Sequence, residues 1–90
     1  MHGIHKDQKA ILTRLKKIQG QLTGIERMIL QDTYCIDIIA QTSAIKSAIS
    51  SVEDTMLESH LEHCLKKKMT PSTLENMKSE IIKVYKLKRK

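Results

Sequence analysis

Residues 11–29 read ILTRLKKIQGQLTGIERMI, and the spacing of the apolar side chains in this stretch decides the fold. These side chains recur in alternating steps of four and three residues, at Ile11, Leu15, Ile18, Leu22, Ile25 and Ile29. Such an a/d heptad pattern is typical of helices that pack against each other along their length. The pattern predicts a first helix over about residues 6–30.

A second long helix follows a short interruption of the heptads at Gln31-Asp32-Thr33. We expect Asp32 or Thr33 to cap this helix by accepting a free backbone N–H. No Gly or Pro occurs between Tyr34 and Met69, which favours one continuous helix over about residues 34–67. Its apolar residues keep helical spacing at Ile38, Ile45, Ile49, Val52 and Met56.

A third, shorter helix is predicted after Thr70-Pro71. Proline bars the residue before it from the helical region and suits the first turn of the helix that follows. We expect Ser72 and Glu75 to form a capping box at its start. The helix ends in a Lys-rich tail, and its apolar residues are Leu74, Met77, Ile81, Ile82, Val84 and Tyr85.

The composition predicts one small all-α domain, residues 1–90. A chain of 90 residues buries too little surface to form two cores. Three Gly and one Pro are too few for the turns of an all-β chain or for a Gly-rich phosphate loop. With two Tyr, no Phe and no Trp, the chain has no aromatic platform on which nucleic-acid bases could stack.

A hairpin of two long helices leaves a wide apolar stripe uncovered, and we expect another copy of the chain to cover it. Two such hairpins would form a four-helix bundle. The alternative is a monomer in which the third helix packs back on the first two.

The charge is unevenly distributed along the chain, whose net charge is +6. Residues 1–25 carry five basic groups and one acidic group, residues 63–90 carry nine and two, and the segment between them carries two and seven. Basic ends favour a polyanionic partner such as DNA. Neither a membrane span nor a signal peptide is visible, so we expect a cytoplasmic protein with no membrane partner.

Three possible metal ligands lie on one face of the second helix. His60 and Cys64 are four residues apart, so they point the same way. From Cys35 to His60 the helix turns by about 2500°, within about 20° of seven full turns. These two residues lie roughly 37 Å apart along the axis and cannot bind one ion within a single helix. Two antiparallel copies would bring Cys35 of one chain beside His60 and Cys64 of the other, at two equivalent sites.

This register places the crossing of the two helices near residues 48 and 49. Small residues that would allow a close approach gather there, at Ala44, Ser47, Ala48 and Ser51. Lys46 would face Glu53 of the partner subunit, and we hypothesise that this ion pair sets the register.

Two thiolates and one imidazole form a soft, low-coordinate donor set. Such a set suits Cu(I), whereas Zn(II) takes a fourth ligand and Ni(II) or Co(II) favours more nitrogen and oxygen donors. His2, His5 and His63 are further nitrogen donors, so those metals stay open at this point. The alternative interpretation is a helical adaptor in which the cysteines are ordinary core residues.

Four motifs in register resemble the copper-sensitive operon repressor (CsoR) family of bacterial metal and thiol sensors. They are Arg14 to Ile25 (RLKKIQGQLTGI), Tyr34-Cys35, Ala44 to Ala48 (AIKSA) and His60 to Cys64 (HLEHC). The resemblance implies that Cys35, His60 and Cys64 bind Cu(I), with Tyr34 and Glu80 as supporting residues around the metal. It also implies a dimer of antiparallel hairpins that pairs into tetramers, without a helix-turn-helix.

The family also narrows the choice of inducer. Relatives that sense nickel or cobalt have His at the position of Cys64, persulfide sensors lack the His at position 60, and formaldehyde sensors lack the second Cys. The resemblance implies that the apo tetramer represses and that Cu(I) releases it from operator DNA, so that copper efflux or buffering genes are expressed. Nickel, cobalt, persulfide or formaldehyde sensing is the alternative.

The first helix has a basic face opposite its apolar stripe. Gly20 and Gly24 lie on this basic face and carry no side chains there. We expect this face to contact DNA phosphates, with a contact between dimers as the alternative reason for the glycines. The predicted DNA-binding residues are Lys9, Arg14, Lys16, Lys17, Lys66, Lys67 and Lys68. Lysines contact mainly the phosphate backbone, so the operator sequence does not follow from them. A cysteine enzyme is the rival class, but three helices provide neither a wide substrate pocket nor oxyanion donors.

Overall fold

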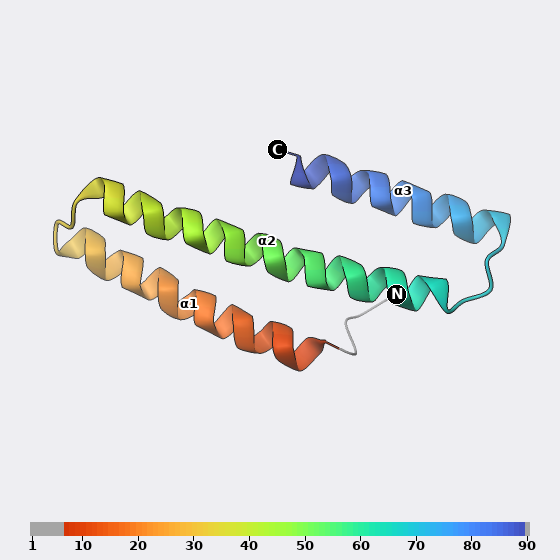
Figure 1. The fold of residues 1–90 in the computed structure, drawn as a ribbon, viewed down its shortest axis with the longest axis horizontal. Coiled ribbons are helices and arrows are strands. Elements are labelled where there is room, and N and C mark those ends of the chain that lie inside the picture. Colours follow the sequence, from red (N-terminus) through yellow and green to blue (C-terminus); the bar gives the residue numbers. More distant parts are fainter. Residues whose placement is uncertain (1–6, 90) are drawn as a thin grey trace. The chain divides into compact units, whose positions relative to one another are not determined.

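The structure, a computed structural model, describes residues 7–89 as three helices joined by two short connections. Helix α1 spans Gln8–Leu30, α2 spans Cys35–Leu65 and α3 spans Pro71–Lys88 (Figure 1). No strand occurs within the described residues. The prediction of an all-α chain with three helices is confirmed, and each predicted end lies within about two residues of the observed one.

Two compact units divide the chain, and the boundary between them falls inside α2. The first unit ends at His60 and holds α1 with most of α2. The second begins at Leu61 and holds the last turn of α2 with α3. Within the described residues, no helix is long and apolar enough to cross a membrane.

The core of the first unit lies between α1 and α2, which run antiparallel as a hairpin (Figure 1). Residues seven apart on α1 pack against residues seven apart on α2, because two turns of helix return a side chain to nearly the same face. The buried set is Ile11, Ile18, Ile25, Ile45 and Val52, with Ile38 and Ala48 partly buried against it. Burial of each such aliphatic side chain contributes roughly 1.5–3 kcal/mol, so this single layer holds the hairpin together.

The hairpin turn depends on a left-handed residue, Asp32, with a φ of 54°. Asp tolerates this conformation better than most residues with a side chain. The backbone N–H of Thr33 donates to the carbonyl of Met28 at 3.0 Å and closes the end of α1. The carbonyl of Tyr34 accepts from Asp37 and begins α2. The expected cap at Asp32 or Thr33 is therefore wrong, because both residues belong to the turn and Tyr34 holds the cap position.

Helix α3 begins on a different cap from the one predicted. The hydroxyl of Thr70 accepts a hydrogen bond from the backbone N–H of Thr73 at 3.1 Å, with Pro71 in the first helical position. The two threonine hydroxyls also lie 2.8 Å apart, within hydrogen-bond distance. The predicted capping box of Ser72 with Glu75 is wrong, because the cap is Thr70 and Ser72 is already the second residue of the helix.

Half of the heptad stripe of α1 stays uncovered in the described chain. The positions at Leu15, Leu22 and Ile29 are 38%, 47% and 59% exposed, whereas the alternate positions are buried. In the second unit, α3 has no buried residue, and Leu74 and Tyr85 are exposed. Each of the two units, taken by itself, thus leaves apolar side chains exposed, as expected of a subunit in a larger assembly.

Candidate metal centre and nucleic-acid interface

The three predicted metal ligands lie at the two ends of α2. Cys35 is the first residue of the helix and is exposed. His60 is half-buried and Cys64 is buried, and they are one turn apart near the other end. Because α2 is continuous over 31 residues, the geometry argued from the sequence applies, with one face shared and a separation of roughly 37 Å along the axis.

The described residues of one chain do not form a complete ligand set. Among the described residues, no group of three or more His, Cys, Asp or Glu side chains is close enough to hold a metal ion. His60 and Cys64 alone offer one imidazole and one thiolate, both of which suit a soft metal. A third donor has to come from outside this pair. His2 and His5 lie outside the described residues.

The face of α2 that carries the ligands also carries exposed apolar side chains. Ile49 is 43% exposed and lies fourteen residues from Cys35, which places it within about 40° of the same face. Ile39 and Met56 are also exposed. Two of the four small residues that we expected at the helix crossing face α1 instead. Ala48 packs on the hairpin core and Ser51 lines a cavity toward α1, so that part of the expectation is wrong.

The two predicted supporting residues occupy different units. Tyr34 directly precedes Cys35, is exposed, and accepts two backbone hydrogen bonds at the start of α2, at 3.0 Å from Asp37 and 3.3 Å from Ile38. Its position at the end of the helix follows from the turn at Asp32. Glu80 lies in the middle of α3 and is exposed.

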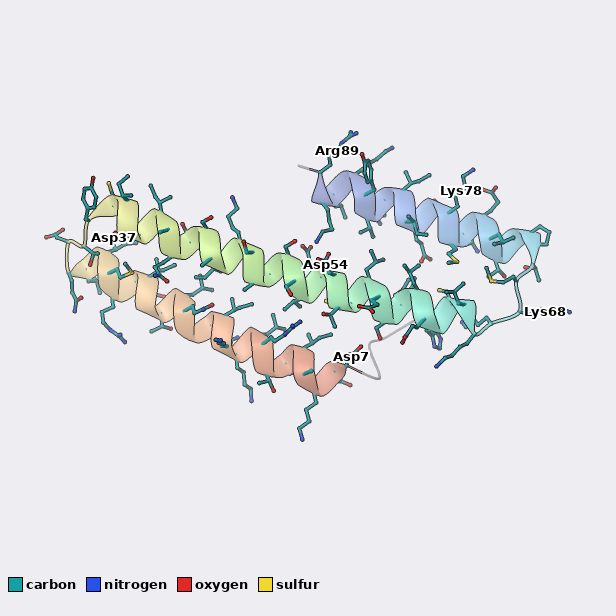
Figure 2. All side chains as sticks on the ribbon, in the orientation of Figure 1. Asp7, Asp37, Asp54, Lys68, Lys78 and Arg89 are labelled. Atoms are coloured by element: carbon teal, nitrogen blue, oxygen red, sulfur yellow. The ribbon has the colours of Figure 1, made fainter. Side chains whose placement is uncertain are left out.

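The predicted DNA-binding residues are exposed on two segments. Lys9, Arg14, Lys16 and Lys17 belong to α1. Lys66, Lys67 and Lys68 belong to the connection between α2 and α3, where Figure 2 shows the side chain of Lys68. Lysine side chains in such positions favour contacts with phosphate groups over the reading of base edges.

The two glycines of α1 have no packing reason within the described chain. A Cβ atom added at Gly20 or Gly24 would meet nothing within 4 Å. Glycine in the middle of a helix costs roughly 1 kcal/mol relative to alanine. If these residues are there to let a neighbour approach, that neighbour is DNA or another chain.

Arg14 is the basic residue that the hairpin holds in place. Its guanidinium donates to the hydroxyl of Thr55 on α2 at 3.0 Å, and that hydroxyl donates to the carbonyl of Ser51 at 3.2 Å. Since the single hydroxyl proton of Thr55 is used on a backbone carbonyl, its lone pairs are turned toward Arg14. Sequence reasoning missed Thr55, because residues 41 positions apart meet only once the hairpin has formed.

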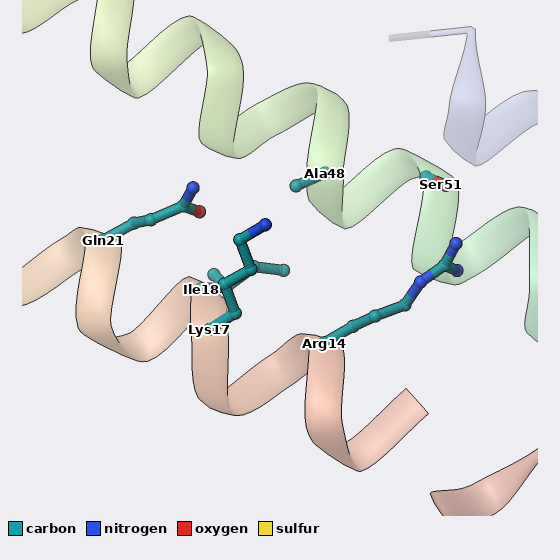
Figure 3. Close-up of a pocket in the computed structure, with 6 residues that line it drawn as sticks. All are labelled: Arg14, Lys17, Ile18, Gln21, Ala48 and Ser51. Carbon is teal, nitrogen blue, oxygen red and sulfur yellow. The ribbon is translucent and has the colours of Figure 1, made fainter. Parts of the chain in front are cut away.

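A cavity of about 230 Å³ opens beside this bond, between α1 and α2. Figure 3 shows the residues that line it, which are Arg14, Lys17, Ile18, Gln21, Ala48 and Ser51. Gln21 and Ser51 were not predicted as functional residues. The spacing of Arg14 and Gln21, seven residues apart, was the available signal that they share a face.

Comparison with known proteins places these features in a family. Residues 7–87 match the family described as metal-sensitive transcriptional repressor. The chain belongs to this family. It is 38% identical over 85 residues to the copper-sensing transcriptional repressor CsoR of Bacillus subtilis (strain 168), which covers 94% of this chain and 84% of that protein. It is 44% identical over 64 residues to the copper-sensing transcriptional repressor RicR of Mycobacterium tuberculosis (strain ATCC 25618 / H37Rv), covering 71% and 67%.

Two solved structures have a similar fold. The copper-sensing repressor CsoR with Cu(I) from Geobacillus thermodenitrificans NG80-2 matches with a TM-score of 0.84 and 36% identity, over 100% of this chain and 95% of that one. A variant of the formaldehyde-responsive regulator FrmR from Salmonella enterica serovar Typhimurium matches with a TM-score of 0.77 and 30% identity, over 97% and 98%.

The resemblance drawn from the sequence motifs is thereby confirmed. A metal-sensitive repressor binds DNA and metal, and the family is one of transcriptional repressors rather than enzymes. The enzyme alternative is therefore set aside.

Proposed function

We propose that this repressor responds to Cu(I), binding operator DNA when metal-free and releasing it when the metal binds. The observation that carries the proposal is the donor set of α2, in which two cysteines and one histidine lie along one face of a continuous helix. The copper-sensing relatives and the CsoR structure with Cu(I) support it.

The metal site is proposed to form between two chains. Cys35 of one chain would join His60 and Cys64 of a second, antiparallel chain, and symmetry would give two such sites in each dimer. Two thiolates and one imidazole fit Cu(I), which accepts three soft ligands, whereas Zn(II) takes a fourth. When bound, Cu(I) would act as a structural effector and undergo no reaction. The exposed Ile49 lies near the midpoint between the ligands and would form the centre of the dimer seam.

Tyr34 and Glu80 are proposed to support the ligands. A carboxylate that accepts a hydrogen bond from the far nitrogen of His60 would hold its tautomer and link the site to α3. Tyr34 directly precedes Cys35, so it would support the metal site from the chain that supplies this cysteine. Substitution of such supporting residues typically costs about 10- to 100-fold in metal affinity.

Operator DNA is the proposed partner of the basic residues on α1 and of Lys66, Lys67 and Lys68. Dimers would pair into tetramers, so that several basic segments contact the phosphate backbone together. Thermodynamic linkage then requires that Cu(I) bind the free protein more tightly than the DNA complex. Because operator DNA lies in the bacterial cytoplasm, we place the protein there.

The test is a fluorescence-anisotropy titration of duplex DNA from upstream of the protein's own gene. It compares the apo protein with the protein loaded anaerobically with Cu(I), with Ni(II), with formaldehyde and with a persulfide donor. We expect tight binding by the apo form and a loss of affinity with Cu(I) alone. Release by another inducer, with Cu(I) inactive, would assign the protein to a different branch of the family.

The ligand set is tested by exchanging one donor at a time. Cys35→Ala, His60→Ala and Cys64→Ala should each bind operator DNA as the wild type does and fail to release it with Cu(I). Ser43→Ala, at an exposed position on the same helix, is the matched control and should release normally. A Cys64→Ala protein that still released DNA would contradict the proposed ligands.

A further inference from the structure

A side-chain hydrogen bond joins α1, which carries basic residues, to α2, which carries the metal donors. The guanidinium of Arg14 donates to the hydroxyl of Thr55 at 3.0 Å. Figure 3 shows the Arg14 side chain extending from α1 toward α2, near Ser51. Both partners belong to the first compact unit, so the bond lies inside that unit. The position of the Arg14 guanidinium therefore depends on the position of α2.

The hydroxyl of Thr55 is itself fixed to the backbone of α2. It donates its proton to the carbonyl of Ser51 at 3.2 Å, which is one turn earlier in the helix. This bond stops the hydroxyl from rotating freely and leaves its lone pairs for Arg14. The acceptor of Arg14 therefore moves together with α2. Because hydrogen bonds weaken steeply with distance and angle, a movement of α2 relative to α1 would break the contact with Arg14.

The partner of Arg14 is an uncharged group, and this sets the contact apart from an ion pair. A carboxylate at position 55 would hold the guanidinium and also compensate its charge. A hydroxyl holds the guanidinium and leaves its positive charge available to an anion. An arginine side chain that is already ordered loses less rotamer freedom when it binds DNA. The contact with Thr55 thus keeps Arg14 both ordered and fully charged.

The nearest metal donor lies on another face of the same helix. His60 follows Thr55 by five residues, which corresponds to a rise of about 7.5 Å and an angle of about 140° around the helix axis. No break in α2 separates the two residues. One helix thus holds Arg14 on the face toward α1 and presents an imidazole on a different face. A displacement of α2 at His60 would reach Thr55, because packed secondary elements move as stiff units.

We propose that Thr55 is the positioning residue through which α2 controls Arg14, and that the bond between them transmits metal binding to the DNA-contacting helix. The bond forms in the metal-free protein and orders Arg14. When Cu(I) binds, α2 moves relative to α1 and Arg14 is released. The metal and the DNA in this proposal rest on the proposed function, to which it adds the residue pair that links the two sites. Energetic coupling requires an element with two arrangements, and the Arg14 side chain, held or released, is that element.

The direct test is NMR relaxation of the Arg14 Nε–H group in the full-length protein, which reports motion on the picosecond to nanosecond timescale. We expect an ordered Arg14 in the metal-free wild type and in Thr55→Ser, which keeps the hydroxyl. Arg14 should be mobile in Thr55→Val and in the wild type loaded anaerobically with Cu(I). Equal order in the wild type and Thr55→Val, or in the metal-free and loaded wild type, would overturn the proposal.

The second test measures operator affinity by fluorescence anisotropy, with and without Cu(I). Thr55→Val should weaken binding by the metal-free protein roughly two- to tenfold, the effect of losing one hydrogen bond. The Cu(I)-loaded protein should be unaffected, because the bond is already absent there. The ratio of the two affinities should therefore fall by the same factor. Equal losses in both states would show a general structural role for Thr55 and overturn the proposal.

Thr42→Val is the matched control for this measurement. The hydroxyl of Thr42 also donates to a backbone carbonyl of α2, that of Ile39 at 2.9 Å, but it lies thirteen residues before Thr55 and away from the contact with Arg14. Thr42→Val should keep the wild-type ratio of the two affinities, and so should Thr55→Ser. The same fall in Thr42→Val as in Thr55→Val would contradict the assignment.

A double-mutant cycle connects the effect of Thr55 to Arg14. In the Arg14→Ala background, Thr55→Val should change neither operator affinity nor its response to Cu(I), because the bond is already lost. A further loss in this background would show that Thr55 acts on something other than Arg14. Operator release of the wild type by Cu(I), with the same affinity ratio in Thr55→Val, would overturn this inference and leave the proposed function standing. Wild-type operator binding that Cu(I) does not weaken would overturn the proposed function, and the order of Arg14 in the metal-free variants would then decide its positioning by Thr55 alone.

Discussion

The two faces of α2 carry similar apolar residues and serve different purposes. On one face, Ile45 and Val52 are buried against α1 and form the core of the hairpin. On the other, Ile49 is exposed and shares its face with Cys35 and His60. A helix that only stabilised a hairpin would need the first face alone. For the second face, we propose that another copy of the chain covers it.

The largest effect is expected from the ligand face. Removal of the Cys64 thiol should lower Cu(I) affinity by more than the roughly 100-fold typical of supporting residues, because a direct ligand is lost. Competition with a chelator of known Cu(I) affinity measures this. Met56→Leu, a change of similar volume on α2, is the control and should bind normally. Equal affinities for the wild type and the Cys64→Ala variant would show that the ligand face holds no copper.

A comparison of Ile45→Ala with Ile49→Ala separates the two faces energetically. Loss of the buried Ile45 side chain should cost about 2–5 kcal/mol of stability, at every protein concentration. Loss of Ile49 should act mainly through association, so its effect should depend on protein concentration. Urea denaturation at several concentrations distinguishes the two. If both variants were destabilised equally and independently of concentration, the faces would not differ as described.

The heptads of α1 and the break at Thr70-Pro71 were enough to predict the three helices. Local spacing could not show which of the heptad positions on α1 would be buried against α2. Ile18 and Leu22 are both apolar heptad residues, and only Ile18 is buried. The predicted cap of α3, Ser72, lies two residues after the observed cap, Thr70, because both residues carry the hydroxyl that a cap needs. Thr55, Gln21 and the cavity depend on the pairing of two helices, so no local pattern contains them.

The sequence placed Cys35, His60 and Cys64 on one face by the arithmetic of a helix alone. The long uninterrupted segment between Tyr34 and Met69 made that arithmetic reliable. The same arithmetic grouped four small residues into one crossing point, and there it failed, because Ala48 and Ser51 face α1. Helical rotation identifies residues that share a direction, whereas their partner is decided by packing.

A smaller effect is expected at Gly20, on the side of α1 away from the core. Gly20→Ala should raise the stability of the free protein by about 1 kcal/mol, since the added methyl group meets no neighbouring atom. The same change should weaken operator binding or tetramer formation, because either DNA or another chain would approach the backbone at this glycine. Thermal unfolding, anisotropy and light scattering measure the three quantities. If the variant were more stable and kept both operator binding and tetramer formation, a close approach of DNA or another chain would not explain Gly20.

The smallest effect is expected at the turn that joins the two helices. Asp32→Gly should raise stability by about 0.5 kcal/mol, because relief of left-handed strain exceeds the entropic cost of glycine. Asp37→Gly, in the first turn of α2, is the matched control and should lower stability by about 1 kcal/mol. Thermal unfolding compares them, and the same sign for both would contradict the role given to Asp32.

The central claim is that Cys35 binds copper together with His60 and Cys64 of another chain. Mixing refolded Cys35→Ala and Cys64→Ala proteins tests it most directly, because each mixed dimer would contain one intact site although neither variant has any. Anaerobic Cu(I) titration against a chelator should show tight binding at about a quarter of the sites after random mixing and at none before. An absence of tight sites in a mixture shown by mass spectrometry to contain mixed dimers would contradict the account.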